Sequence, residues 1–291
     1  MIGFFANIFG YLLDFLYKFL SNYGLAIILF SIIIKLLMLP LSIKQQKSVK
    51  KNAKIQDEMK QIQFKYKNDP EKLNQETIEL YKREKMNPFS GCFSAIIQIV
   101  LLFSVFYLVR SPLTYMKKVN PDIINKYKTQ IQEENLSNNS GYPEIEIIRE
   151  IDNLKSLEKN KDNQKEIDSL KLNMEFLGLD LSKVPTKSLN DYKVYIIPVL
   201  YVISSFISMR ISTNMQTNSK NKEDADENSE FNSLEQANKS MSWIMPIMSV
   251  SIAIVAPLGL ALYWLVNNVL MIAERLVLNR FVKDEEENEN V

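Results

Sequence analysis

Long runs without charged side chains dominate this sequence and constrain what it can fold into. A helix that crosses the hydrocarbon core of a bilayer needs about 20 mostly apolar residues, because its backbone polar groups find no water there. Such runs cover residues 23–43, 86–109, 194–209 and 240–273, and Lys35 is the only charged residue within them. The runs therefore predict an integral membrane protein.

The last run is long enough for two helices. Pro257, Leu258 and Gly259 interrupt it with residues that favour a turn, so we expect a tight hairpin of two spans there. The predicted spans are residues 23–43, 89–110, 193–212, 241–256 and 258–280. Five such segments are too many for the buried helices of a soluble core. The expected fold is an all-α, polytopic membrane protein with a five-helix transmembrane bundle.

Residues 1–22 predict an amphipathic helix that lies in the membrane interface. Polar and apolar side chains would occupy opposite sides of this helix. The polar side carries Asn7, Asp14, Lys18 and Ser21, and the apolar side carries Phe4, Ile8, Leu12, Phe15 and Phe19. A cleaved signal peptide fits less well, because Asp14 would interrupt its apolar core.

The loop of residues 44–88 sets the expected orientation. It holds twelve basic and seven acidic residues. Loops that flank spans and are rich in Lys and Arg stay in the cytoplasm. We therefore expect the N-terminus and residues 111–192 outside the cell, and residues 213–240 and the acidic tail 281–291 inside. The predicted location is the cytoplasmic membrane.

The same 44–88 loop predicts a cytoplasmic helical hairpin. Two apolar stripes at helical spacing are separated by Asn68, Asp69 and Pro70, and a proline after an Asp cap is a signal for a helix start. The outer segment, residues 111–192, is rich in Asn, Lys and Glu, and we expect it to be partly helical.

Composition removes most catalytic chemistry. The chain has no histidine and a single cysteine, Cys92. Cys/His zinc sites, Ser/His triads and intramolecular disulfides are therefore excluded. We predict no metal, no cofactor and a protein that is not an enzyme.

Lys35 is the residue that points most directly to function. A charged side chain near the centre of a bilayer costs ~2.5–3.5 kcal/mol on insertion scales, so such residues are usually kept for function. Several other polar residues of the predicted spans gather toward the cytoplasmic half: Ser31, Ser94, Gln98, Ser205, Ser208, Asn267, Asn268 and Glu274. We predict a water-filled cavity open to the cytosol, with Glu274 as a possible charge partner of Lys35.

Other interpretations remain open at this point. Lys35 can extend to the lipid headgroups or form a purely structural pair, and each serine can simply bond a neighbouring helix. A small-solute or ion transporter also places polar groups inside the membrane, although no inverted halves are visible. A Ser-Lys peptidase using Ser31 and Lys35 is less consistent with the sequence, because no second element supplies an oxyanion hole.

Four segments resemble the YidC/Oxa/Alb family of membrane protein insertases, in its five-span, Gram-positive form. They read NYGLAIILFSIIIKLLMLPLSIKQQKS, MNPFSGCFSAIIQIVLLFSVFYLV, MEFLGLDLS and MPIMSVSIAIVAPLGLALYWLVNNVLMIA. The likeness covers most of residues 20–112 and 174–280. It implies a chaperone-like insertase that guides nascent membrane proteins into the lipid bilayer through a hydrophilic groove.

The resemblance also assigns roles to residues and partners. Lys35 takes the place of a family arginine in the groove, Ser31 and Gln98 match polar groove positions, and Trp264 matches an aromatic residue that meets the substrate. The 44–88 hairpin would receive clients from a ribosome or targeting factor, and a Sec translocon would be a neighbour. The basic C-terminal tail of the family is absent, because this chain ends in KDEEENENV.

Overall fold

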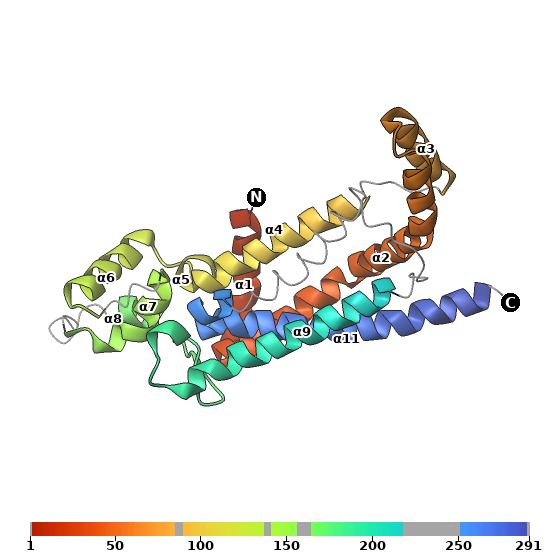
Figure 1. The fold of residues 1–291 in the computed structure, drawn as a ribbon. Coiled ribbons are helices and arrows are strands. Elements are labelled where there is room, and N and C mark those ends of the chain that lie inside the picture. The colour runs from red at the N-terminus through yellow and green to blue at the C-terminus, as the bar shows by residue number, and fades with distance from the viewer. Residues whose placement is uncertain (1, 85–89, 137–140, 156–163, 218–250, 290–291) are drawn as a thin grey trace.

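The computed structural model describes residues 2–84, 90–136, 141–155, 164–217 and 251–289, and helices dominate this part of the chain (Figure 1). The elements in chain order are α1 (Ile2–Leu20), α2 (Tyr23–Lys65), α3 (Pro70–Arg83), α4 (Ser90–Arg110), α5 (Pro112–Tyr115), α6 (Pro121–Glu133), α7 (Pro143–Glu150), η1 (Ile151–Asn153), α8 (Gln164–Leu170), β1 (Glu175–Phe176), β2 (Leu179–Asp180), η4 (Pro185–Lys187), η5 (Tyr192–Tyr195), α9 (Ile196–Thr217) and α11 (Leu258–Glu289).

The helices confirm an all-α, polytopic membrane protein. Within the described ranges, four helical segments are long and apolar enough to cross a bilayer: Ile2–Leu20, Tyr23–Ser48, Tyr192–Ile211 and Leu258–Leu278. A shorter apolar segment, Ile96–Arg110, belongs to α4. The predicted span 241–256 lies mostly outside the described residues, so the count of five spans stays a prediction.

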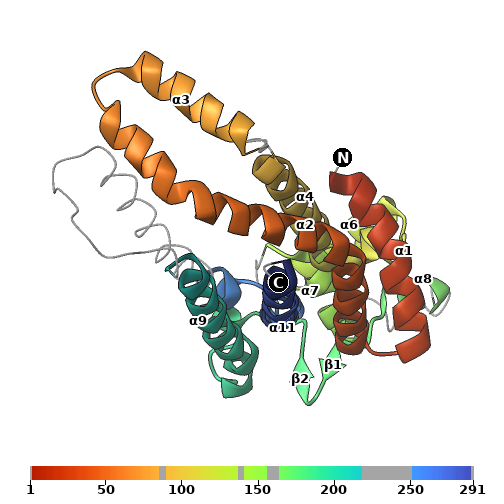
Figure 2. The same cartoon turned by 90° about the vertical axis from the view of Figure 1, so that its right-hand side faces the viewer.

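Helix α11 is the centre of the bundle. It packs along α9 on one side and along α2 on another, and α4 contacts both α2 and α11 (Figures 1 and 2). The buried core between these helices includes Ala26, Ile27 and Phe30 of α2 and Leu260 and Ala261 of α11. The small alanines let the helix axes approach closely, which is how membrane helices gain packing energy without a hydrophobic drive between them.

Helix α1 runs across the direction of α9 and α11 and packs against α2 and α4 (Figure 1). Its buried face carries Ala6, Gly10, Leu13 and Leu16. Large apolar side chains on its outer face are exposed, at Phe4, Ile8, Tyr11, Phe15 and Phe19. The crossing direction favours an interfacial position over a span, although length and composition alone permit both.

Helix α2 is longer than the predicted span 23–43. It continues through Pro40 to Lys65, because no capping residue or glycine follows the apolar part to end it. Its last turns form an arm with α3, which begins at Pro70 with Asp69 accepting from the Lys72 N–H at 3.1 Å. Arg83 pairs with Glu58 across this arm.

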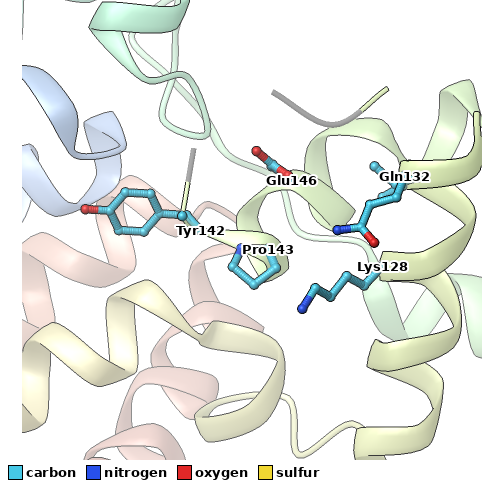
Figure 3. Close-up of a pocket in the computed structure, with 7 residues that line it drawn as sticks. Lys128, Gln132, Tyr142, Pro143 and Glu146 are labelled. Carbon is cyan, nitrogen blue, oxygen red and sulfur yellow. The ribbon is translucent and has the colours of Figure 1, made fainter. Parts of the chain in front are cut away.

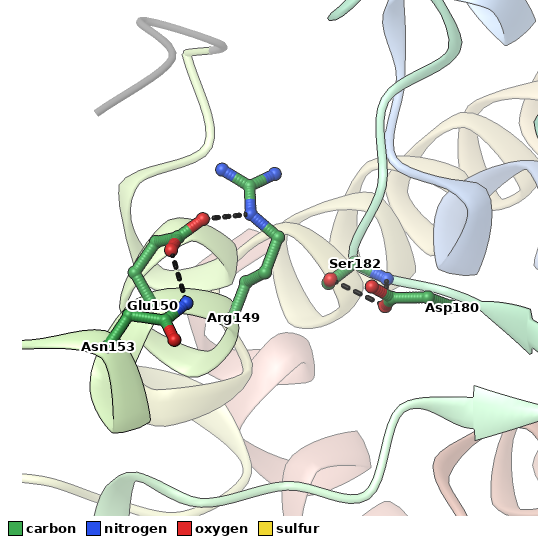
Figure 4. Close-up of polar contacts among 5 residues, drawn as sticks. All are labelled: Arg149, Glu150, Asn153, Asp180 and Ser182. Carbon is green, nitrogen blue, oxygen red and sulfur yellow. Dashed lines mark hydrogen bonds and ion pairs between the residues drawn. The ribbon is translucent and has the colours of Figure 1, made fainter. Parts of the chain in front are cut away.

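The described residues of 111–192, which we call the outer segment after their predicted side of the membrane, form a small helical layer around their own core. Ile124, Tyr127 and Ile131 of α6 face Ile147 and Ile151, and all five are buried. Polar side chains also pair within this segment. Glu150 accepts from the side chains of Arg149 and Asn153, and Asp180 accepts from the N–H and hydroxyl of Ser182 (Figure 4).

A two-residue turn joins the antiparallel strands β1 and β2 (Figure 2). Leu177 and Gly178 occupy the turn with φ of 50° and 73°, the left-handed values that a type I′ hairpin requires. This backbone region is ordinary for glycine but costs a residue with a side chain about 1–2 kcal/mol. Leucine at position 177 therefore carries a conformational cost, and its backbone position does not explain the choice of leucine.

The chain around this hairpin ties α2 to α11. The Tyr23 N–H donates to the Asn173 carbonyl at 3.0 Å, at the start of α2. The Leu258 and Gly259 N–H groups donate to the Lys183 and Leu181 carbonyls at 2.9 and 2.8 Å, at the start of α11. Unpaired N–H groups at two helix starts are thus satisfied by one segment, which fixes how far α2 and α11 slide along each other.

Glu144 generates a testable pH dependence of the outer segment. Burial raises the pKa of this carboxyl, while hydrogen bonds from the Thr114 hydroxyl (2.6 Å) and N–H (3.0 Å) lower it, and the net direction is upward from 4.5. A raised pKa in the folded state means that the stabilising contribution is complete below pH 4.5 and is lost as the pH rises through the folded pKa. Glu144→Gln should flatten this loss.

Amide hydrogen exchange of α7 in detergent, measured from pH 4 to pH 8 and corrected for intrinsic exchange rates, tests this. The exposed carboxylate of Glu133 provides the matched control, and Glu133→Gln should leave the wild-type profile unchanged. A Glu144→Gln profile that still loses protection across the same range would contradict the assignment.

Candidate functional site

Lys35 of α2 forms an ion pair with Glu274 of α11. The Lys35 Nζ lies 2.6 Å from the Glu274 Oε2, and the two side chains are 20% and 9% exposed. Both residues belong to helical segments that are long and apolar enough to cross a bilayer. Each charge is therefore stabilised mainly by the other, and removing one leaves its partner unpaired in a medium of low dielectric constant.

Glu274 keeps an acceptor unused. Its Oε1 is buried and has no hydrogen-bond partner in the described part of the chain, although a carboxylate can accept several hydrogen bonds. A buried acceptor without a donor costs free energy. Glu274 is therefore only partly satisfied by its contact with Lys35.

Ser31 lies one helical turn before Lys35 and is buried. Its hydroxyl donates to the Ile27 carbonyl of the same helix at 2.7 Å. This is the usual arrangement of a serine inside a membrane helix. Together with the Lys35 pairing, it removes the geometry of a Ser-Lys dyad, since the serine proton and the lysine amine both have other partners.

A second set of contacts joins α9 to the neighbouring face of α11. The Asn268 side-chain amide donates to the Ser205 hydroxyl at 2.7 Å, and the Arg275 guanidinium lies 3.2 Å from the Ser208 carbonyl oxygen and 3.4 Å from its hydroxyl. Because residues four and seven apart share a helix face, these contacts form one polar stripe along the α9–α11 seam.

An aromatic pair ends this stripe on the side of the outer segment. The rings of Trp264 and Tyr201 lie 5.9 Å apart with their planes tilted by 35°. Trp264 is one turn before Asn268, and Tyr201 is one turn before Ser205, so the apolar pair follows directly on the polar one. Trp264 is half-buried, which leaves part of its ring available for contact.

The remaining predicted groove residues are placed less completely. Asn267 is half-buried on α11, on the face that also carries Glu274 two turns further on. Gln98 is exposed on α4. The side chain of Ser94 lies outside the described residues. The structure thus joins Lys35 with Glu274 and Ser205 with Asn268, while the grouping of all nine predicted residues around one groove stays a prediction.

Arg275 is the site residue that sequence reasoning missed. It lies at the end of an apolar run, where a basic residue is an ordinary membrane-interface anchor. Its spacing of seven residues from Asn268 places both residues on one helix face, and this spacing could have identified Arg275 from the sequence. A second positive charge therefore stands beside Glu274 along the chain but bonds to α9.

Two cavities lie in the outer segment rather than at these residues. One, of about 170 Å³, is lined by Lys128, Gln132, Tyr142, Pro143 and Glu146 between α6 and α7 (Figure 3). The other, of about 320 Å³, lies beside the β1–β2 hairpin and includes Lys183, Asp191 and Lys193. Neither contains a predicted groove residue.

The ion pair predicts non-additive effects on stability. Lys35→Met or Glu274→Met alone leaves an uncompensated buried charge and should destabilise the folded protein by about 3–5 kcal/mol. The double variant removes both charges and should unfold close to the wild type. The free energies of unfolding of the wild type, the two single variants and the double variant form a double-mutant cycle. They are measured by circular dichroism during unfolding in mixed detergent micelles.

Lys18 and Asp14 supply the control, because their pair spans 2.6 Å between neighbouring turns of α1 with the lysine 71% exposed. Lys18→Met should change the stability by less than about 1 kcal/mol. If the effects of Lys35→Met and Glu274→Met simply add in the double variant, the two side chains do not interact.

Comparison with known proteins identifies the family of this chain. The family model described as "60Kd inner membrane protein" matches residues 15–286. A "Membrane protein insertase YidC" from Chlorobaculum parvum is 30% identical over 270 residues, which are 92% of this chain and 35% of that protein. A protein of the same name from Fusobacterium nucleatum is 38% identical over 120 residues, 39% of this chain and 58% of that protein.

The coverage differs between these relatives. This chain spans about a third of the length of the Chlorobaculum proteins that it matches along most of its own length. Another relative of this name, from Caldanaerobacter subterraneus, is 40% identical over 102 residues, 35% of this chain and 50% of that protein. Because the family model extends over nearly the whole sequence, the chain belongs to the 60Kd inner membrane protein family, and its resemblance to YidC/Oxa/Alb proteins is confirmed.

Proposed function

We propose that this protein is a membrane protein insertase that guides hydrophobic segments of nascent proteins into the cytoplasmic membrane. The observation that carries the proposal is the Lys35–Glu274 pair, held between two helices that can span the bilayer in a chain of this family. A charge pair at this place offers polar partners where lipid offers none. The relatives named insertases support the same activity.

The client would use the site by exchanging partners. Its polar tail enters from the cytosol and brings a carboxylate or backbone carbonyl to Lys35, together with an N–H group for the unused Glu274 Oε1. Ser205, Ser208 and Asn268 extend this polar path along α9 and α11. The hydrophobic segment meanwhile lies against Trp264 and the face of α4 that carries the exposed Gln98. Partition of this segment into lipid releases it without ATP or a covalent step.

The existing ion pair keeps this binding weak. Two unit charges 4 Å apart attract by ~4 kcal/mol at an effective dielectric constant of 20. A client carboxylate gains that attraction only by weakening the contact of similar strength between Lys35 and Glu274. The exchange is therefore nearly balanced, so an acidic tail is held briefly, and a neutral polar tail is not strongly disfavoured.

The arrangement in the membrane follows from the charges. We place the N-terminus and residues 111–192 outside, and the arm of α2 and α3 and the C-terminal tail inside, because the arm carries the basic excess. In this placement α1 lies in the outer interface. In this proposal the arm receives clients from a ribosome or targeting factor, and the family resemblance adds a Sec translocon as a neighbour.

The alternative functions lack support among the described residues. A Ser-Lys peptidase needs a free amine beside a free hydroxyl, whereas Lys35 pairs with Glu274 and Ser31 bonds Ile27. A solute transporter finds no support in the family comparison, because the relatives described above are named insertases.

Complementation tests the charge role of Lys35. In cells depleted of the protein, Lys35→Arg should restore insertion of small membrane proteins with acidic outer tails, because it keeps the positive charge. Lys35→Gln should reduce their insertion, by about tenfold if the client contact contributes 1.4 kcal/mol. Protease protection of the tail in inverted vesicles measures this.

The matched control is Lys35→Gln/Glu274→Gln, which removes both charges and leaves no unpaired carboxylate. It should fold but remain defective for acidic tails. Wild-type insertion by this double variant would exclude a role for the charge.

Crosslinking tests the path of the client. A photoreactive amino acid at Gln98 or Trp264 should capture the hydrophobic segment of a ribosome-stalled membrane protein. Thr129, exposed on α6 in the outer segment, is the control position and should capture much less. Capture at Thr129 alone would place the path elsewhere.

A further inference from the structure

Three large side chains beside the outer ends of the spans are unusually exposed. Leu177 at the hairpin turn is 87% exposed, Leu189 after η4 is 71% exposed, and Tyr192 at the start of η5 is 77% exposed. We name these three residues the outer rim. The hairpin and η5 line the same cavity, so the rim is a local feature of one corner of the molecule.

Backbone hydrogen bonds fix the position of the hairpin relative to the first residues of α2 and α11. The segment that carries Leu177 bonds to Tyr23, where α2 begins, and to Leu258, where α11 begins. These two residues are also the first of two apolar segments that can cross the membrane, and Tyr192 is the first of a third. The rim therefore lies at the depth where the spans leave the bilayer.

The rim continues a surface that faces lipid. Ile196, Val199 and Ile203 of α9 are exposed apolar residues at helical spacing from Tyr192. Inside a spanning helix such a stripe contacts acyl chains. Because Tyr192 starts this stripe at the membrane boundary, it has the place that interfacial tyrosines occupy, with the ring in the acyl region and the hydroxyl at the headgroups.

The hairpin turn itself favours an apolar role for Leu177. Both turn residues have positive φ, and asparagine or glycine suits the first position better than leucine does. The side chain makes almost no contact within the protein, so packing does not explain the leucine. Next to it, Phe176 is packed so tightly on Gly24 that a Cβ there would lie 2.5 Å from the ring, which holds the turn in place.

Charged residues adjoin the rim, since Asp191 and Lys193 flank Tyr192 in the sequence. Lys183 pairs with Asp191 at 2.9 Å, and Lys193 lines the same cavity. Apolar side chains next to charged ones are typical of a bilayer surface, where acyl chains and headgroups meet.

We propose that the outer rim is a lipid anchor: Leu177, Leu189 and Tyr192 insert into the bilayer leaflet on the side of residues 111–192. The occupant of this surface is lipid rather than another protein, because the rim is continuous with the lipid-facing stripe of α9. The anchor fixes the hairpin to the membrane surface, and the hairpin in turn holds the starts of α2 and α11. This inference does not depend on the insertase function.

Spin labelling measures the depth of the rim directly. Cys92 is the only cysteine, so Cys92→Ser provides a background for single nitroxide labels in the full-length protein. The labelled protein is reconstituted into vesicles of phosphatidylcholine and phosphatidylglycerol, and accessibility to oxygen, which enriches in lipid, is compared with accessibility to a water-soluble nickel chelate.

Labels at Leu177→Cys and Leu189→Cys should show an oxygen-to-nickel ratio several-fold higher than a label at Thr129→Cys, and closer to that of Val199→Cys on α9. Leu189 lies outside the positive-φ turn. A label at this position therefore measures the depth of the rim even if a cysteine at position 177 disturbs the hairpin. A ratio equal to that of Thr129 places the rim in water and overturns the proposal. Exclusion of both reagents also overturns it, because the rim would then be covered by another copy of the protein.

Discussion

A lysine inside a membrane-spanning helix has to find a partner, and this requirement organises the rest of the bundle. Lys35 finds Glu274 at 2.6 Å. The contact needs α2 and α11 to face each other with one particular rotation, because a turn of either helix by one residue moves the side chain by about 100°. A pair of opposite charges thus specifies a helix interface that apolar packing alone leaves loosely defined.

Helix α11 contacts α2 and α9 with two adjacent faces. One face presents Glu274 to α2, and the next presents Trp264, Asn268 and Arg275 to α9. The seam between the helices therefore carries hydrogen-bonding groups over several turns, while their outer surfaces are apolar. Such a seam lowers the cost of bringing a polar peptide into the membrane, since peptide groups exchange partners instead of losing them.

The outer segment contributes by holding the helix ends. The chain from Asn173 to Lys183 bonds to the first residues of α2 and α11, far from the ion pair along each helix. Fixing the start of both helices sets their relative height, and the ion pair sets their rotation. The two constraints together place Lys35 opposite Glu274.

The sequence permits some of this to be predicted and not the rest. The uncharged runs predict the membrane helices because bilayer thickness demands them, and Glu274 is identifiable as a partner because it is an acid inside the predicted span 258–280, where acids are rare. The helix rotations that bring Asn268 to Ser205 are not predictable, since the spans are apolar nearly all round. The β1–β2 hairpin has strands of two residues, too short to show a period of two, and α2 extends into the arm because nothing in its sequence stops it.

The exchange of partners at Lys35 is the central claim, and solid-state NMR in bilayers tests it most directly. Dipolar dephasing between ¹⁵N-labelled lysine amines and ¹³C-labelled glutamate carboxyls should show a Lys35 contact that disappears in Glu274→Gln, while the contact between Lys126 and Glu166 at 2.8 Å persists. Addition of a client with an acidic tail should weaken that contact and create one to the client carboxylate. Dephasing of the Lys35 amine by lipid phosphorus, with no contact to Glu274, would contradict the account.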